Sequence, residues 1–215
     1  MLRRRPRLAH PPGIWERLRD RFQGRDQFLT SGPGDLPLLL INYPRGMSDA
    51  AREIELAYTH TFEALRPETR EPYAEIVRAL PALVVVLVRR KNPCGCLGHH
   101  HPQGTESRLS QRLASELGHP VGEIDIAYEG IREWRPQPIS SMALGELGGP
   151  VEAMHTRAAT LAVLLHELEH LARPDGRESE IRRRSNAFYT AVMEELAAGE
   201  MGVDYGMTSP PPPRA

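Results

Sequence analysis

Apolar residues recur every three or four positions over much of the chain, the spacing that places them on one face of a helix. This pattern predicts helices over residues 13–22, 48–65, 67–80, 107–118, 151–172 and 177–198. The segment 151–172 contains neither Gly nor Pro. Only the four residues RPDG separate it from the last helix, so we expect these two helices to lie antiparallel and in contact.

Strands are predicted where apolar residues are continuous or alternate with polar ones. The runs LPLLLIN (36–42) and ALVVVLVRR (82–90) are short and apolar, which is typical of buried strands. In GEIDIAYEG (122–130) apolar and polar residues alternate, so this strand is expected to be half-buried. Either this strand or ISSMAL (139–144) is expected to be the sheet edge that pairs with an extended polypeptide. Together the elements indicate the α+β class.

The composition is that of a globular protein with one folded domain. Lys and Arg (27) nearly balance Asp and Glu (28) in the 215 residues, so the charge gives no reason to expect a nucleic-acid partner. Prolines and arginines without an apolar period predict a disordered tail at 1–12 and a Pro-rich tail at 201–215, around a single domain at 13–200. No secretory signal or membrane-spanning run is visible and only two cysteines occur, so we expect a cytoplasmic protein without membrane contact.

The sequence HELEH places His166 and His170 one helical turn apart, with Glu167 after the first histidine. Residues four apart on a helix project from the same face, so both imidazoles can bind one Zn²⁺. In an H-E-x-x-H arrangement the glutamate lies beside the zinc-bound water and acts as its general base. The run TLAVLL before the motif predicts a helix that is buried up to its polar end.

A catalytic zinc needs a third protein ligand and an open position. The metzincin extension is absent, because Arg173 and Gly176 stand where it requires a glycine and a third histidine. The remaining candidates are carboxylates of the next element: Asp175, Glu178, Glu180, Glu194 and Glu195.

The antiparallel arrangement selects among these carboxylates. It places His170 opposite about residue 179 and His166 opposite about residue 183, which favours Glu178 and Glu180 over the more distant pair. Glu178 continues the apolar stripe of the last helix and Glu180 does not, so Glu178 is the predicted ligand. A capping box between Asp175 and Glu178 is an alternative role for this residue.

The motif and the helix that follows it resemble gluzincin-type metallopeptidases. After HELEH the chain reads Glu178-x-x-Ile181-x-x-x-Ser185-Asn186-x-Phe188-Tyr189. This is similar to the compact bacterial zinc peptidases of the effector type, whose helix reads E-x-x-A-x-x-x-E-N-x-Y, and less closely to ImmA/IrrE-type peptidases. The resemblance covers about 35 residues and implies a zincin-like fold, one zinc and hydrolysis of peptide bonds. The chain has Ile and Ser where the pattern has Ala and Glu.

Other residues near the motif are interpreted as structural. Tyr189 is expected in the core rather than beside an oxyanion, and His155 at the surface or at a helix cap. The arginines 182–184 are interpreted as a solvated helix face, from which one side chain could pair with Glu169 or a substrate carboxylate.

A second cluster of metal-binding residue types lies in NPCGCLGHHHP, residues 92–102. It contains Cys94, Cys96, His99, His100 and His101, and thiolates and imidazoles both suit zinc. Three interpretations remain open: a flexible polar loop, a second metal site, and a thiolate that reaches the hairpin zinc and keeps it latent.

The sequence therefore predicts a zinc metallopeptidase that acts on a protein or peptide substrate. In this hypothesis His166, His170 and Glu178 bind the metal, and Glu167 activates the zinc-bound water. One alternative is a zincin-like regulator or toxin-like interaction module that binds metal with little or no hydrolysis. Another is a helical scaffold that binds no metal.

Overall fold

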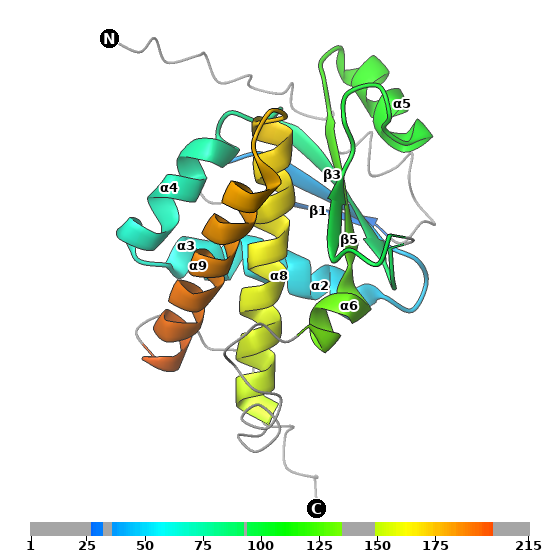
Figure 1. Ribbon diagram of the computed structural model, residues 1–215. Coiled ribbons are helices and arrows are strands. Elements are labelled where there is room, and N and C mark those ends of the chain that lie inside the picture. Colours follow the sequence, from blue (N-terminus) through cyan, green and yellow to red (C-terminus); the bar gives the residue numbers. More distant parts are fainter. Residues whose placement is uncertain (1–26, 32–35, 93, 135–148, 200–215) are drawn as a thin grey trace, which may run out of the picture.

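The computed structural model describes residues 27–31, 36–92, 94–134 and 149–199 (Figure 1). The strands are β1 (Gln27–Ser31), β2 (Leu38–Asn42), β3 (Leu83–Arg89), β4 (Gly98–His100) and β5 (Gly122–Ala127). The helices are α2 (Ser48–Leu56), the π-helix η1 (Ala57–Thr61), α3 (Phe62–Ala64), α4 (Pro67–Val77), α5 (Arg108–Leu117), α6 (Tyr128–Glu133), α8 (Gly149–Ala172) and α9 (Glu178–Ala197). The tails predicted at 1–12 and 201–215, the helix predicted at 13–22 and the strand predicted at 139–144 lie outside the described residues.

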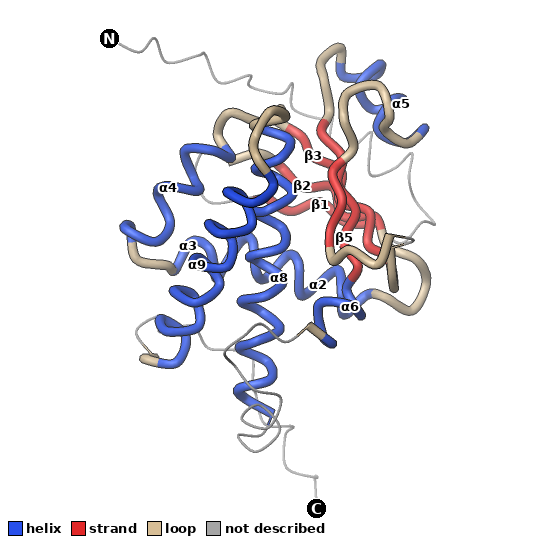
Figure 2. Tube along the Cα trace, in the orientation of Figure 1, coloured by secondary structure: helices blue, strands red, loops and turns tan. Residues whose placement is uncertain are grey.

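The strands form one mixed sheet in the order β1-β2-β3-β5-β4. Strands β2, β3 and β5 are parallel, whereas β1 and β4 pair antiparallel at the two ends. Figure 2 shows α5 on one side of the sheet and the other described helices on the opposite side. Alternate residues of β3 serve the two layers, with Val84 and Val86 in the larger core and Val85 beneath α5. The α+β prediction is confirmed.

Strand β5 differs from its prediction in burial and in position. It lies inside the sheet between β3 and β4, so it is not an edge. Its residues are buried on both faces, and Glu123 and Asp125 find partners in Ser107 before α5 and in Arg89 of β3. Glu123 accepts hydrogen bonds from the backbone and hydroxyl of Ser107, and Asp125 pairs with Arg89 at 2.7 Å. Buried polar residues that have hydrogen-bonding partners thus produced an alternation that resembled a half-buried strand.

Helix α8 is the central element of the helical layer. Its leucines at 161, 164 and 168 have no exposed surface, and it packs antiparallel against α9 (Figure 1). Apolar residues of α9, including Phe188 and Val192, belong to the same core. The buried helical hairpin predicted from the periodicity is therefore present. Within the described residues, no helix has the length and apolar character needed to cross a bilayer.

A buried ion pair joins the two helices of this hairpin. The side chain of Glu169 has no exposed surface, and its carboxylate accepts hydrogen bonds from Arg184 of α9. Arg173 lies 3.5 Å away from the same carboxylate. Glu169 holds the pKa of the Arg184 guanidinium above its usual value through this hydrogen bond. One of the three consecutive arginines is therefore an interhelical partner, as one of the sequence-based alternatives proposed.

Replacing Arg184 by Ala should destabilise the fold, because it leaves the buried Glu169 with a weaker partner. We expect the free energy of unfolding to fall by about 3 kcal/mol, the lower end for breaking a buried pair, since Arg173 remains nearby. Urea denaturation would measure the change. Arg183→Ala is the matched control: Arg183 is exposed on the same helix, and its loss should cost less than about 0.5 kcal/mol. Equal losses in the two variants would contradict this role of Glu169.

Candidate metal centre

The side chains of His166, His170 and Glu178 converge between α8 and α9. The Nε2 atoms of the two histidines are 3.2 Å apart. Oε2 of Glu178 lies 2.8 Å from Nε2 of His170 and 3.6 Å from Nε2 of His166. Among the described residues, these three form the one group of histidine, cysteine and carboxylate side chains close enough to hold a metal ion.

The separations fit a tetrahedral zinc. Ligand atoms about 2.0–2.1 Å from such an ion lie roughly 3.3 Å from one another, because they occupy corners of a tetrahedron. The three observed separations, 2.8, 3.2 and 3.6 Å, lie around that value. Two imidazoles and a carboxylate are also a ligand set that zinc accepts in catalytic sites. The residues present therefore fit a zinc with one coordination position left for a small ligand.

Ser185 of α9 fixes the orientation of the first histidine. Its Oγ lies 3.0 Å from Nδ1 of His166 and 3.0 Å from the carbonyl oxygen of Ile181. The hydroxyl can donate its single hydrogen to that carbonyl, so it accepts from the Nδ1–H of the imidazole. This arrangement leaves Nε2 of His166 unprotonated toward the centre, which is the state that binds a metal. Sequence reasoning named Ser185 as part of the resembling helix but did not find this role.

The protonation states of the ligands also suit a cation. Burial lowers the pKa of His166 below its ordinary value of 6.5 and outweighs the opposite effect of the Glu167 and Glu178 carboxylates. Partial burial raises the pKa of Glu178, but the Arg182 guanidinium and the two imidazoles outweigh it, so this pKa lies below its usual range. At neutral pH the centre therefore presents neutral His166 and ionised Glu178.

The carboxylate of Glu167 points to a different side of α8, toward strand β4. A Cβ atom on Gly98 would lie only 2.5 Å from Oε1 of Glu167, so the glycine leaves the space that this carboxylate occupies. Oε2 of Glu167 lies 3.7 Å from Nδ1 of His100. The imidazole of His100 also stacks on that of His170, with ring centres 4.6 Å apart and planes 9° from parallel. Strand β4 thus forms a wall of the centre.

No protein-family model, curated protein or solved structure matches this chain. The interpretation of the centre therefore depends on its own geometry.

The alternative carboxylates lie elsewhere. Asp175 and Glu180 are exposed and do not belong to the metal-binding group. The residue before α9 is Arg177, with no side-chain cap, so the capping box between Asp175 and Glu178 is not formed. Glu195 is buried far along α9, where it accepts a hydrogen bond from the backbone N–H of Arg66, next to α4.

Among the described residues, the cysteine and histidine cluster is not a second group that could hold a metal ion. Cys94 and Cys96 are joined in a disulfide, so neither supplies a thiolate to the centre. The histidines that follow contact opposite sides of the sheet: His100 stacks on α8, and His101 lies 3.4 Å from Asp125 on the α5 side. The expected loop also contains strand β4 itself. The sequence interpretation missed that this strand contacts the HELEH motif through His100.

Two further residues were interpreted from the sequence. Tyr189 is buried, as expected of a core residue. His155 is buried as well, so its interpretation as a surface or capping residue was wrong. The Nδ1 of His155 lies 2.7 Å from the Tyr189 hydroxyl, and its Nε2 lies 2.9 Å from the carbonyl oxygen of Trp134. These contacts satisfy both ring nitrogens inside the core.

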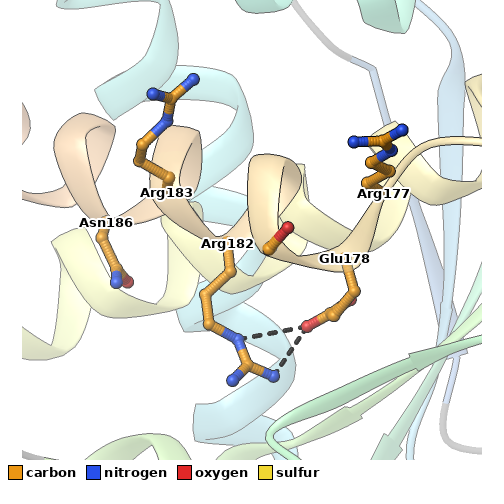
Figure 3. Close-up of a pocket in the computed structure, with 6 residues that line it drawn as sticks. Arg177, Glu178, Arg182, Arg183 and Asn186 are labelled. Carbon is orange, nitrogen blue, oxygen red and sulfur yellow. Dashed lines mark hydrogen bonds and ion pairs between the residues drawn. The ribbon is translucent and has the colours of Figure 1, made fainter.

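An open groove of about 800 Å³ runs along the outer side of α9 (Figure 3). It is lined by Arg177, Glu178, Ser179, Arg182, Arg183 and Asn186. In Figure 3 Glu178 and Arg182 point to the same side of the helix, and Arg182 donates two hydrogen bonds, of 2.7 and 3.2 Å, to Oε1 of Glu178. The other oxygen of Glu178 faces the histidines, so the groove and the metal centre share this residue.

Replacing Ser185 by Ala should weaken zinc binding while the fold persists. The change removes the acceptor that holds His166 in its metal-binding tautomer, and such outer partners typically contribute about 10–100-fold in affinity. Competition with a chromophoric chelator would measure the affinity. Thr190→Ala is the matched control, because its hydroxyl bonds only to the backbone of the same helix on an exposed face. An unchanged zinc affinity in Ser185→Ala would contradict the orienting role.

Zinc binding should resist mild acid. A histidine must be neutral to bind a metal, and the pKa of His166 lies below its ordinary value of 6.5. Protons therefore compete for this ligand only at pH values below about 6.5, and the Glu178 carboxylate is protonated lower still. The imidazole of His166, followed by NMR in the zinc-free protein, should therefore gain its proton below about pH 6.5, so that its protonation does not weaken zinc binding at higher pH. Protonation of His166 with a midpoint above about pH 6.5 would contradict this prediction.

Proposed function

We propose that this protein is a zinc-dependent metallopeptidase. The observation that carries the proposal is the convergence of His166, His170 and Glu178 beside a separate carboxylate, Glu167, that faces a sheet edge. A purely structural zinc would need a fourth protein ligand. The described residues bring three to the centre, which leaves room for water.

The roles divide between the residues by position. His166, His170 and Glu178 would hold the ion, which when bound supplies the positive charge that makes water a nucleophile near neutral pH. Glu167 is largely buried, and within the described residues its carboxylate forms no hydrogen bond. It is therefore available to take a proton from the attacking water and to return it to the amine nitrogen as the peptide bond breaks.

Strand β4 would bind the substrate main chain. Among the described strands it lies at the end of the sheet, and its neighbours Leu97 and His101 bond to β5 through a carbonyl and an N–H. Because bonded residues alternate in an antiparallel ladder, the backbone groups of Gly98 and His100 point away from β5. An extended peptide that adds to this edge would run beside Glu167. This strand replaces β5 as the proposed substrate-binding edge.

The proposal is tested by zinc content and hydrolysis in a small set of variants. Protein purified without a histidine tag should contain about one zinc per chain by elemental analysis and should cleave an unstructured protein such as casein. Glu167→Gln should keep the zinc and lose most of the activity, since the amide cannot accept the proton. Glu178→Gln should lose zinc affinity, because a charged ligand becomes neutral.

Glu180→Gln is the control for both variants. It removes a carboxylate from the exposed side of the same helix and should keep zinc and activity. Loss of zinc in Glu180→Gln, but not in Glu178→Gln, would show that Glu180 is the third ligand in place of Glu178. Absence of zinc from folded wild-type protein would refute the proposal. Bound zinc with no hydrolysis, or hydrolysis that survives in Glu167→Gln, would favour the metal-binding regulator instead.

A further inference from the structure

The sequence left His100 either in a flexible polar loop or in a second metal site, whereas in the structure it lies against two residues of the HELEH motif. Its ring is nearly parallel to that of His170, with the ring centres 4.6 Å apart. Its Nδ1 lies 3.7 Å from Oε2 of Glu167. These contacts connect a ligand and the proposed base through one imidazole of strand β4, some 70 residues earlier in the chain.

Two features of the structure distinguish His100 from a residue that merely fills space. First, Gly98 and His100 are two apart on a strand, so they share the face toward α8. The close approach at Gly98 brings the Glu167 carboxylate against the strand, beside the His100 ring. Second, the next residue His101 belongs to the other side of the sheet, where it meets Asp125. The strand therefore presents a single histidine of the HHH run to α8.

His100 is also distinct from the metal ligands. Its ring nitrogens do not belong to the group formed by His166, His170 and Glu178 within the described part of the chain. Its ring faces that of His170 instead of sharing a point with it. A stacked ring of this kind limits rotation of the ligand beneath it. A ring nitrogen 3.7 Å from a carboxylate needs only a small rotation to come within hydrogen-bond distance of it.

We propose that His100 is a positioning residue of the active centre, with two separable effects. Its ring face holds His170 in the orientation that binds the metal. Its Nδ1, which lies 3.7 Å from the Glu167 carboxylate, donates a hydrogen bond to that carboxylate when zinc and substrate are bound, and so orients it to accept a proton. The inference rests on the proposed peptidase function, and it assigns to strand β4 a role in ordering the catalytic groups besides the binding of substrate.

Two substitutions separate these effects. His100→Phe keeps an aromatic ring over His170 but has no N–H beside Glu167. His100→Asn places an amide N–H near the position of Nδ1 but removes the ring. His99→Ala is the matched control, because His99 is the adjacent, exposed residue of the same strand. For each zinc-loaded variant we would measure the rate of zinc transfer to a chromophoric chelator, then kcat and KM on one peptide.

We expect zinc release about tenfold faster in His100→Asn and nearly unchanged in His100→Phe, because only the phenyl ring replaces the stack. We expect kcat about tenfold or more lower in His100→Phe and closer to wild type in His100→Asn, with KM changed less than kcat in both. Parallel changes of both quantities in the two variants, or effects no larger than those of His99→Ala, would overturn the inference.

The wild-type protein separates failure of this inference from failure of the proposed function. If wild-type protein holds no zinc, the proposed function is wrong and this inference falls with it. If wild-type protein holds zinc but hydrolyses nothing, the release rates still decide the contact with His170, and the role at Glu167 is refuted. If wild-type protein is active and the two variants do not separate, the peptidase assignment stands and the positioning role of His100 does not.

Discussion

The structure depends on finding partners for four polar side chains at the carboxyl end of a buried helix. Helix α8 is apolar and enclosed over most of its length, but within five residues it carries His166, Glu167, Glu169 and His170. Successive residues of a helix point about 100° apart, whereas residues four apart share a face, so the two histidines point one way and Glu167 and Glu169 point in two others. Each of these three directions needs its own polar partner, because a buried polar group without one is costly. The elements around α8 are arranged to meet them.

Helix α9 supplies the polar partners for the two histidines and for Glu169. Its first turn brings Glu178 to the histidines, and two turns later Arg184 reaches the fully buried Glu169. Phe188 and Val192 of the same helix pack in the core, and this apolar packing fixes the position of α9 along the axis of α8 and so the level at which its polar residues contact α8. The arrangement of His166, His170 and Glu178 is thus a consequence of helix packing. The third direction, that of Glu167, is met by β4, where a glycine permits the close approach.

The contact between Glu178 and the histidines could be predicted from the sequence, and the contact between Glu167 and β4 could not. The spacing of HELEH, the four-residue connection and the apolar stripe of α9 are local features, and together they indicate that Glu178 lies beside His170. Strand β4 has three residues and no apolar alternation, and its place depends on pairing with β5, more than twenty residues later. The burial of β5 was missed for a similar reason: Glu123 is satisfied by Ser107, a partner that no periodicity reveals.

The way Glu178 is held explains how an exposed residue can complete a metal centre. About half of its side chain is accessible (51%), and a free glutamate at such a position would sample many rotamers. Here Oε1 accepts two hydrogen bonds from Arg182, one turn later on α9, and this leaves Oε2 directed at the histidines. The arginine thus orders the carboxylate and keeps it ionised, while the imidazoles lie on the buried side. In the resembling peptidases a glutamate stands where this chain has Ser185, whose hydroxyl contacts the first histidine here. In the proposed centre one ligand would therefore be oriented by a neutral hydroxyl and another by a guanidinium, and the carboxylates near the ion would be limited to one ligand and one base.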